Sequence, residues 1–250
     1  MNIKFLSTAV FSFTAIAASV VLTSGCAAQS GTTRTAPAAQ GSGTKQAATA
    51  PAVHPGLLDP SRATEKAPEK FRVKFLTTKG DFVVEVTRAW APNGADRFYN
   101  MCRVGYYKDI AIFRSIKDFM FQFGIHGDPK VSAKWMDANI KDDPAIPGIS
   151  NAPGTLSFAQ TGRPNTRSVQ MFINRGNNDF LDKARGGGAP FVPFARIVEG
   201  ADVVAKIHVT GENKPEANVQ GNFQRHGNDY IKRQYPNVDF IRSVKISVTN

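Results

Sequence analysis

The chain has 250 residues, of which 42% are hydrophobic and 10% aromatic, so it is long enough to bury a sizeable core. Its formal net charge of +11 favours anionic partners. The basic residues form no dense run and no nucleic-acid motif is present, so we expect no nucleic-acid partner. The first quarter differs in composition from the rest, which indicates one folded domain behind a non-globular N-terminus.

The N-terminus has the layout of an export signal. Lys4 precedes an apolar run from Phe5 to Leu22, which small residues follow as far as "TSGC". This pattern predicts a signal peptide over residues 1–26. The alternatives are an uncleaved membrane anchor and ordinary cleavage after Ala28.

Cys26 follows Ser24 and Gly25 at the end of the apolar region. This ending resembles a bacterial lipobox, in which the cysteine is acylated and becomes the new N-terminus. Thr23 departs from the more usual leucine three positions before the cysteine. The resemblance implies lipidation of Cys26 and a lipid-anchored, extracytoplasmic protein on a membrane that faces the periplasm.

Residues 27–70 are mostly Ala, Thr, Gly, Ser, Gln and Pro, with almost no large apolar side chains. Such a segment cannot bury enough surface to offset the entropy of ordering. We therefore expect a disordered tether with a mean reach of about 35 to 40 Å. The folded domain is then expected over residues 71–250.

The hydrophobic pattern changes to period two at Phe71, where "FRVKFLTT", a Lys79-Gly80 turn and "DFVVEV" predict a β-hairpin. Residues 92–104 are predicted to form a helix, because apolar residues recur there at three- and four-residue spacing. Many short strands with Gly- and Pro-rich connections favour a mainly β fold, closed into an antiparallel barrel that leaves no exposed edge. The later predicted elements are strands at 111–116, 119–124, 154–160, 169–174, 191–197 and 240–248, and a short helix at 201–207.

The segment 209–238 interrupts this pattern before the last strand. An amphipathic helix packed on the barrel is the favoured interpretation, although Gly221 and Gly227 weaken the pattern. A partner-binding arm is the alternative. The residues on one helical stripe are Val219, Phe223, Tyr230, Ile231 and Gln234.

Several separated motifs together resemble one known family. They are "IFRSIKDFMFQFG" (112–124), "GTLSFAQTGRPNTRSVQMFIN" (154–174), "FLD" (180–182) and "FVPFARIVEGADVV" (191–204). The resemblance is to the cyclophilin family of peptidyl-prolyl isomerases, over nearly all of residues 71–250. It implies an eight-stranded barrel capped by two helices, here with an extra helical insertion. It also implies an isomerase that acts as a monomer, without a cofactor, on proline-containing peptides or unfolded proteins.

Arg114 stands in an otherwise apolar stretch in which Asp118 is the only acid. An X-Pro peptide bond rotates in roughly 10 to 100 s without a catalyst, because its partial double bond gives a barrier near 20 kcal/mol. A hydrogen-bond donor aimed at the prolyl nitrogen competes for the lone pair that makes this bond double. In the family an arginine has this role, and Arg114 matches it. The alternative is an exposed strand arginine, or one paired with Asp118.

The resemblance also implies a groove around Arg114. Gln122 matches a glutamine that hydrogen-bonds the substrate backbone and helps to hold the arginine. Ala159 and Gln160 match a strand whose backbone pairs with the peptide. The other residues implied to contact the substrate, most of them in an apolar proline pocket, are Phe119, Met120, Gln170, Phe172, Phe180 and Leu181.

The chain departs from the family pattern at several positions. Phe113 replaces a common histidine before the arginine, Lys117 and Asp118 replace Pro-Gly, and Phe180 stands where many eukaryotic members have tryptophan. These changes are expected to alter substrate preference more than turnover. The alternative function is a non-catalytic cyclophilin-like module that binds peptides or acts as a scaffold in the cell envelope. A basic surface on 209–238 that binds envelope polymers is compatible with either.

Other patterns in the sequence do not support a second site. The four histidines are scattered without ligand spacing, so we expect no metal site. Asp128, Asp142 and Asp143 precede prolines or lie beside one that does, and turn formation explains them better than an acid/base pair. Cys102 is expected to be a small core residue, with a reactive thiol as the alternative.

Overall fold

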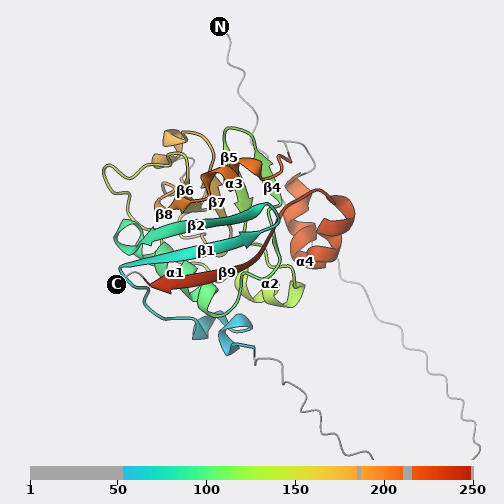
Figure 1. Cartoon of the computed structure of the whole chain (residues 1–250). Coiled ribbons are helices and arrows are strands. Elements are labelled where there is room, and N and C mark those ends of the chain that lie inside the picture. The colour runs from blue at the N-terminus through green and yellow to red at the C-terminus, as the bar shows by residue number, and fades with distance from the viewer. Residues whose placement is uncertain (1–52, 185–186, 211–215, 249–250) are drawn as a thin grey trace, which may run out of the picture. The chain divides into compact units, whose positions relative to one another are not determined.

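The computed structural model describes residues 53–184, 187–210 and 216–248, which lie within one compact unit. They form a curled antiparallel sheet of nine strands in the order β3-β9-β1-β2-β8-β6-β7-β5-β4 (Figure 1). The strands are β1 (Lys70–Thr77), β2 (Gly80–Thr87), β3 (Ile110–Ala111), β4 (Arg114–Ile116), β5 (Met120–Phe123), β6 (Thr155–Phe158), β7 (Met171–Asn174), β8 (Pro193–Glu199) and β9 (Phe240–Val248).

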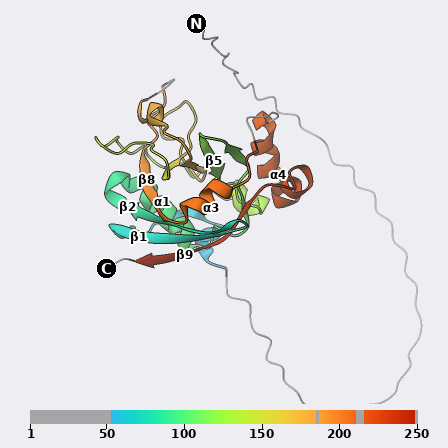
Figure 2. The same ribbon diagram turned by 45° about the horizontal axis from the view of Figure 1, so that its top comes forward.

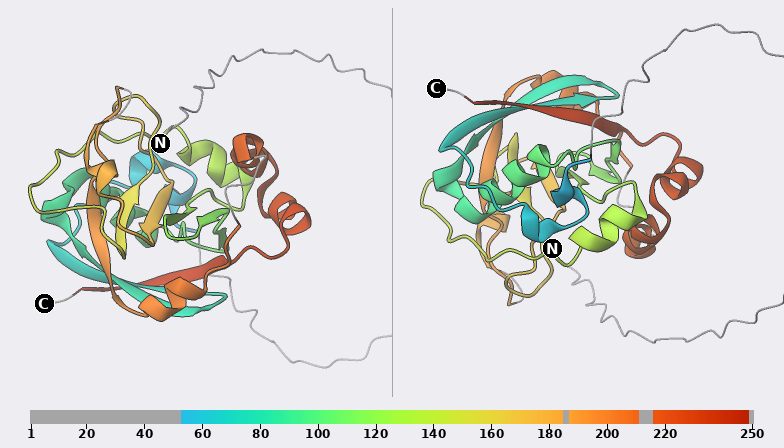
Figure 3. Two further views of the ribbon diagram at one scale, coloured as in Figure 1. Left: turned by 90° about the horizontal axis from the view of Figure 1, so that it is seen from above. Right: turned by 90° about the horizontal axis from the view of Figure 1, so that it is seen from below.

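Four α-helices and four short 3-10 helices in the described ranges accompany the sheet. The helices are α1 (Pro92–Arg103), α2 (Pro129–Trp135), α3 (Ala201–Lys206) and α4 (Glu216–Gln234), and the 3-10 helices are η1 (Pro55–Leu57), η2 (Pro60–Arg62), η3 (Arg88–Trp90) and η4 (Asp179–Asp182). Seen from below, α1 lies across one end of the curled sheet (Figure 3). Within these ranges no helix combines the length and apolar character needed to cross a bilayer.

The mainly β architecture and the helical insertion before the last strand are confirmed, and the difference lies in how the sheet ends. The sequence predicted a closed barrel of eight strands, whereas the sheet has nine strands and two edges, β3 and β4. These edges are consecutive in the chain, so Ile112 and Phe113 bridge the opening covalently. The single strand predicted at 111–116 divides here because Ile112 donates its N–H to the carbonyl of Asp239, while Phe113 turns toward α4.

The core lies on the inner face of the sheet, where the period-two pattern places it. In the β1–β2 ladder Phe75 faces Phe82, and the two rings stack at a centroid distance of 4.8 Å. Phe98 of α1 packs on Phe75 at 6.1 Å, so the helix closes over the same apolar face. Each such ring contributes about 1.5 to 3 kcal/mol by leaving water. Cys102 is half-buried and packs against this core, and burial raises its pKa, which disfavours the reactive thiolate.

The folded unit begins before residue 71, and the described part of the predicted tether is packed on it. The indole of Trp135 donates to the Leu57 carbonyl at 2.8 Å, and Glu65 N donates to the Asn100 side chain at 2.9 Å. Ala67 is 3% exposed. Composition did not predict that residues 53–70 are packed, because hydrogen bonds to the backbone attach this segment and it has few large side chains. The rest of the tether, residues 27–52, and the predicted signal with Cys26 lie outside the described residues.

The aspartates assigned to turns have more specific structural roles. Asp128 is the N-cap of α2 and accepts from Lys130 N at 2.8 Å, with Pro129 at the first helical position. The sequence analysis did not predict this helix. Asp143 is buried and accepts from two backbone N–H groups at the start of α1, those of Asn93 and Gly94.

Helix α4 is the predicted insertion, and it stands beside β4 and β5 (Figures 1 and 2). Val219, Phe223 and Ile231 are buried, as the stripe predicted, while Gln234 is exposed. The helix changes direction at Gly227, where φ is 62°. The segment is therefore packed on the domain, in agreement with the favoured interpretation.

Candidate active site

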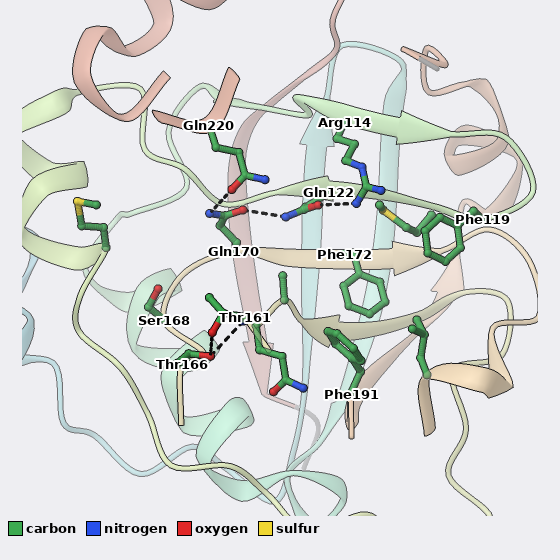
Figure 4. A pocket seen from close by; sticks show the side chains of 15 residues that line it. Arg114, Phe119, Gln122, Thr161, Thr166, Ser168, Gln170, Phe172, Phe191 and Gln220 are labelled. Atoms are coloured by element: carbon green, nitrogen blue, oxygen red, sulfur yellow. Dashed lines mark hydrogen bonds between the residues drawn. The ribbon is translucent and has the colours of Figure 1, made fainter. Parts of the chain in front are cut away.

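A cavity of about 380 Å³ opens beside β4, β5 and β7, and fifteen described residues line it (Figure 4). Its volume falls in the range of small-molecule and peptide subsites. The lining residues are Arg114, Phe119, Met120, Gln122, Met136, Ala159, Gln160, Thr161, Thr166, Ser168, Gln170, Phe172, Leu181, Phe191 and Gln220.

Strand pairing sets the position of Arg114. In the antiparallel β4–β5 ladder Arg114 lies directly opposite Gln122, so both side chains point to the same face. Arg114 is half-buried, and its Nη1 donates to Gln122 Oε1 at 3.2 Å. A neighbouring amide therefore holds the guanidinium at the cavity, as the sequence analysis expected of Gln122.

The hydrogen bonds continue from Gln122 across the sheet. Gln122 Nε2 donates to Gln170 Oε1 at 2.8 Å, and Gln170 Nε2 donates to Gln220 Oε1 at 3.2 Å (Figure 4). Gln122 is only 6% exposed, so these bonds satisfy groups that water does not reach freely. The arginine thus lies at one end of a chain of three amides.

The other end of the cavity is apolar. Met120, Phe172 and Leu181 are buried in a small cluster of their own, separate from the main core. Phe191 packs edge-on against Phe172 at a centroid distance of 5.7 Å. Together with Phe119 they form a receptacle for a compact apolar group within the same cavity as Arg114.

A buried polar network fixes the elements that carry this receptacle. Asn151 is fully buried and donates through Nδ2 to Asp182 Oδ1 and to the Phe191 carbonyl, both at 2.7 Å. Asn178 Nδ2 donates to the Phe119 carbonyl at 2.8 Å. These bonds hold η4 and the chain around Phe191 against the sheet.

Ion pairs of Arg167 hold the loop that forms another wall of the cavity. Arg167 lies between the lining residues Thr166 and Ser168, and it is 2% exposed. Its Nη1 donates to Asp143 Oδ2 at 3.0 Å and its Nε to Asp142 Oδ1 at 3.1 Å. Asp142 and Asp143 are thus ion-pair partners of Arg167, which stabilises the loop.

The cavity collects nine of the ten residues that the sequence analysis placed in the site. Phe180 is the exception: it is 38% exposed at the rim and stacks on Phe119 at 5.9 Å. Gln160 lines the cavity while its Nε2 donates to the Ala189 carbonyl. The lining residues that the sequence analysis did not assign are Met136, Thr161, Thr166, Ser168, Phe191 and Gln220.

Some of these six residues carried a usable signal and others carried none. Ser168 lies two positions before Gln170, and the spacing places both on one face of an extended chain. Phe191 opens the motif at 191–204, but the resemblance assigned it no role in the site. Gln220 follows the buried Val219 on α4, and its sequence gives no indication that it faces the cavity.

The chemistry that this cavity can perform is narrow. Among its fifteen lining residues Arg114 is the one with a side chain that carries a charge at neutral pH, and the rest are amides, hydroxyls and apolar groups. No carboxylate, histidine or thiol in the described lining offers a general base or an activated nucleophile. What the cavity offers is a fixed hydrogen-bond donor, Arg114, beside an apolar receptacle.

The chain matches a protein-family model over more than half of its length. The model described as "Cyclophilin type peptidyl-prolyl cis-trans isomerase/CLD" matches residues 72–224. Peptidyl-prolyl cis-trans isomerase B of Escherichia coli (strain K12) is 37% identical over 139 residues, which cover 54% of this chain and 82% of that protein. A peptidyl-prolyl cis-trans isomerase of Acinetobacter baylyi is 33% identical over 135 residues, which cover 54% of this chain and 70% of that protein.

Solved structures show the same fold. A cyclophilin type peptidyl-prolyl cis-trans isomerase of Cryptosporidium parvum superposes with a TM-score of 0.51 at 23% identity, covering 72% of this chain and 99% of that one. A second structure of that protein was determined in the presence of the dipeptide Ala-Pro. It has a TM-score of 0.51 at 21% identity and covers 71% of this chain and 99% of that one.

Proposed function

Because the chain belongs to the cyclophilin-type peptidyl-prolyl cis-trans isomerases and is an isomerase of this kind, we propose that Arg114 is its catalytic group. The observation that carries the proposal is the cavity in which Arg114 and an apolar receptacle face the same space. The substrate proline ring enters the receptacle of Met120, Phe172 and Leu181. Arg114 then donates a hydrogen bond to the prolyl nitrogen.

The donor acts on the electronic origin of the barrier. Amide resonance places the nitrogen lone pair in the C–N bond, and the twisted transition state returns that pair to nitrogen. An N–H aimed at nitrogen is therefore stronger in the transition state than in the ground state, which is the condition for a rate increase. A guanidinium has five N–H donors in a fixed plane, so it can hold Gln122 and still serve a substrate.

The substrate class that fits this cavity is a proline-containing peptide or an unfolded protein segment. The Ala-Pro dipeptide in the study of the Cryptosporidium protein agrees with this choice, although that likeness shows only the fold. In the proposed complex Gln122 and Gln170 meet the substrate backbone, and the strand of Ala159 and Gln160 lies alongside it. Phe119 and Phe180 form the rim over which the peptide enters.

The decisive experiment compares the purified full-length protein with Arg114→Ala and Arg114→Lys in an exchange-NMR assay of a short X-Pro peptide. We expect kcat/KM to fall about 100-fold in Arg114→Ala, the cost usual for one preorganised donor. Arg114→Lys should recover little, because an ammonium lacks the planar fork. Peptide binding by Arg114→Ala, measured by chemical-shift titration, should persist because the apolar receptacle is intact.

The alternative function, a peptide-binding module without turnover, makes a different prediction. It requires that the wild-type protein bind the peptide and leave its exchange rate unchanged. It also requires that Arg114→Ala change nothing in that rate.

We further propose that the isomerase works outside the cytoplasm, held by a lipid on Cys26 and acting on proteins of the envelope. The support is the sequence of residues 1–26. In a bacterial host with a lipoprotein pathway, an alkyne analogue of palmitate should label the wild-type protein and not Cys26→Ser, and the wild-type protein should sediment with membranes. Equal labelling of Cys26→Ser would refute lipidation at this residue.

A further inference from the structure

Gln220 lines the cavity from a helix, outside the strands on or beside which the other two amides lie. Gln220 lies on α4, in the insertion between residues 209 and 238. The other two amides of the hydrogen-bonded series are Gln122, on β5, and Gln170, directly before β7. Its Oε1 accepts from Gln170 Nε2 at 3.2 Å (Figure 4). The insertion therefore reaches the same hydrogen-bonded chain that ends at Arg114.

The series of hydrogen bonds from Arg114 to Gln220 has a direction. Arg114 donates to Gln122, Gln122 donates to Gln170, and Gln170 donates to Gln220, so in every bond the carbonyl oxygen faces back toward the arginine. A glutamine amide has one accepting end and one donating end, and turning it by 180° exchanges them. Each amide in the series is consequently oriented by the next.

The orientation matters because Arg114 can only donate. If Gln122 were turned over, its NH₂ would face the guanidinium, and two donors would oppose each other. What prevents this is the acceptor on Gln170, whose own amide is fixed by an acceptor further along. That last acceptor is the carbonyl of Gln220, and it comes from outside the sheet.

We propose that Gln220 is a positioning residue, and that its carbonyl sets the polarity of the amide chain that orients the Arg114 guanidinium. This inference rests on the proposed role of Arg114. Helix α4 is thereby part of the isomerase active site, and the insertion contributes to turnover through Gln170 and Gln122.

The helix is anchored firmly enough to hold an acceptor in place. Val219, next to Gln220, is 3% exposed, and Phe223, one turn later, is fully buried. The Phe223 ring meets Phe113 edge-on at 6.1 Å, and Phe113 directly precedes Arg114. The unusual phenylalanine before the arginine is therefore one of the contacts that seat α4.

A second attachment lies further along the helix. Asn228 N donates to the Gly127 carbonyl at 3.0 Å, and Asn228 Nδ2 donates to the Asp109 carbonyl at 2.8 Å. At Gly227 an added Cβ would lie 2.1 Å from the Gly127 carbonyl oxygen, so only glycine permits this approach. The two attachments fix both parts of α4 against the connections that flank β3, β4 and α2.

The test uses three substitutions at Gln220 in the full-length protein. Gln220→Met keeps the length of the side chain and removes the acceptor, so kcat should fall about 3- to 10-fold, the usual worth of one hydrogen bond, with KM changing less. Gln220→Glu keeps an acceptor at the same position and should recover kcat to within about twofold. Gln220→Lys presents a donor and should be at least as impaired as the methionine variant.

Two controls separate positioning from general effects. Gln224→Met changes the same residue type one turn later on α4, and the fifteen described lining residues do not include Gln224, so its kcat should equal that of the wild type. In a Gln170→Met background, Gln220→Met should have no further effect, because Gln220 acts through Gln170. Melting temperatures of all variants show whether any loss of kcat follows a loss of folding.

The outcomes distinguish this inference from the proposed function. If the wild-type protein is active and Arg114→Ala is impaired, the inference is overturned by a normal kcat in Gln220→Met, or by equal losses in the methionine and glutamate variants. If the wild-type protein shows no turnover, the proposed function fails instead. The NMR signals of the Arg114 guanidinium then decide the inference: it requires that they shift in Gln220→Met and keep the wild-type position in Gln220→Glu.

Discussion

His126 shows how a single residue sets a pH response away from the cavity. His126 is 7% exposed, and its ring packs on Tyr106 at a centroid distance of 5.0 Å and accepts through Nδ1 from Asp128 N at 2.9 Å. Burial lowers the pKa of His126, and this effect outweighs the opposing influence of Asp128. The folded protein therefore protonates this imidazole at a lower pH than an unfolded chain does.

The lowered pKa predicts a loss of stability on acidification. An unfolded histidine takes up a proton near pH 6.5, whereas the folded one does so only at a lower pH. Between these two values the unfolded chain binds more protons, so the free energy of unfolding falls as pH falls below about 6.5, by at most about 1.4 kcal/mol per pH unit for this group. Urea denaturation between pH 7.5 and 5.5 measures the slope.

His126→Asn provides the matched control for this prediction. Its Oδ1 can accept the same hydrogen bond from Asp128 N, and it does not titrate. The slope of the unfolding free energy against pH should be smaller in this variant. An unchanged slope would assign the pH response to other groups.

The sequence predicted the residues of the site unevenly, and the reason is physical. Arg114, Gln122 and Phe172 were identified because they stand in an ordered set of motifs on adjacent strands, where spacing determines the face. Gln220 was missed because its partner depends on how α4 docks, and that docking follows from contacts distant in sequence, such as those of Phe113 with Phe223 and of Asn228 with Gly127. A side chain whose role comes from a distant packing contact leaves no local pattern.

At the scale of elements, the periodicity of apolar residues predicted the helices and strands whose form depends on their own sequence. The hairpin of β1 and β2, helix α1 and the final strand agree with their alternating or helical patterns. Helix α2 was missed because it has only Val131 and Trp135 as large buried side chains, although Asp128 and Pro129 form a recognisable start. The division of β3 from β4 depends on Asp239 and α4, which are distant in sequence.

The loop wall of the cavity depends on one buried ion pair. The side chains of Arg167 and Asp143 are 3% and 1% exposed, and the same carboxylate caps the start of α1. Arg167→Met would leave Asp143 buried without its cation. The free energy of unfolding should therefore fall by about 3 to 5 kcal/mol, as measured by urea denaturation at pH 7.

Arg163→Met is the control for this second prediction. Arg163 is exposed in the same loop, so its loss should cost less than about 0.5 kcal/mol. Similar effects of the two substitutions would show that the buried pair does not hold the wall.

At the scale of the whole molecule, the segment before residue 71 belongs in part to the folded domain, which the sequence analysis did not predict. Residues 27–70 were predicted as a tether alone, yet the part from residue 53 is attached to the domain. Composition could not reveal this, because it measures the apolar surface of side chains and not the acceptors that a backbone offers to Trp135 and Asn100. The predicted tether is therefore shortened to residues 27–52.

The attachment predicts that a chain starting at residue 71 is less stable than one starting at residue 53. The shorter chain loses four hydrogen bonds to Trp135, Asn100 and Asp96, the bond from Arg88 N to the Glu69 carbonyl, and the buried Ala67. At about 1 kcal/mol per bond the free energy of unfolding should fall by about 3 to 6 kcal/mol. Isomerase activity of the folded fraction should not change, since residues 53–70 are absent from the described lining of the cavity. Equal unfolding free energies for the two chains would restore the boundary at residue 71 and make the contacts of this segment energetically neutral.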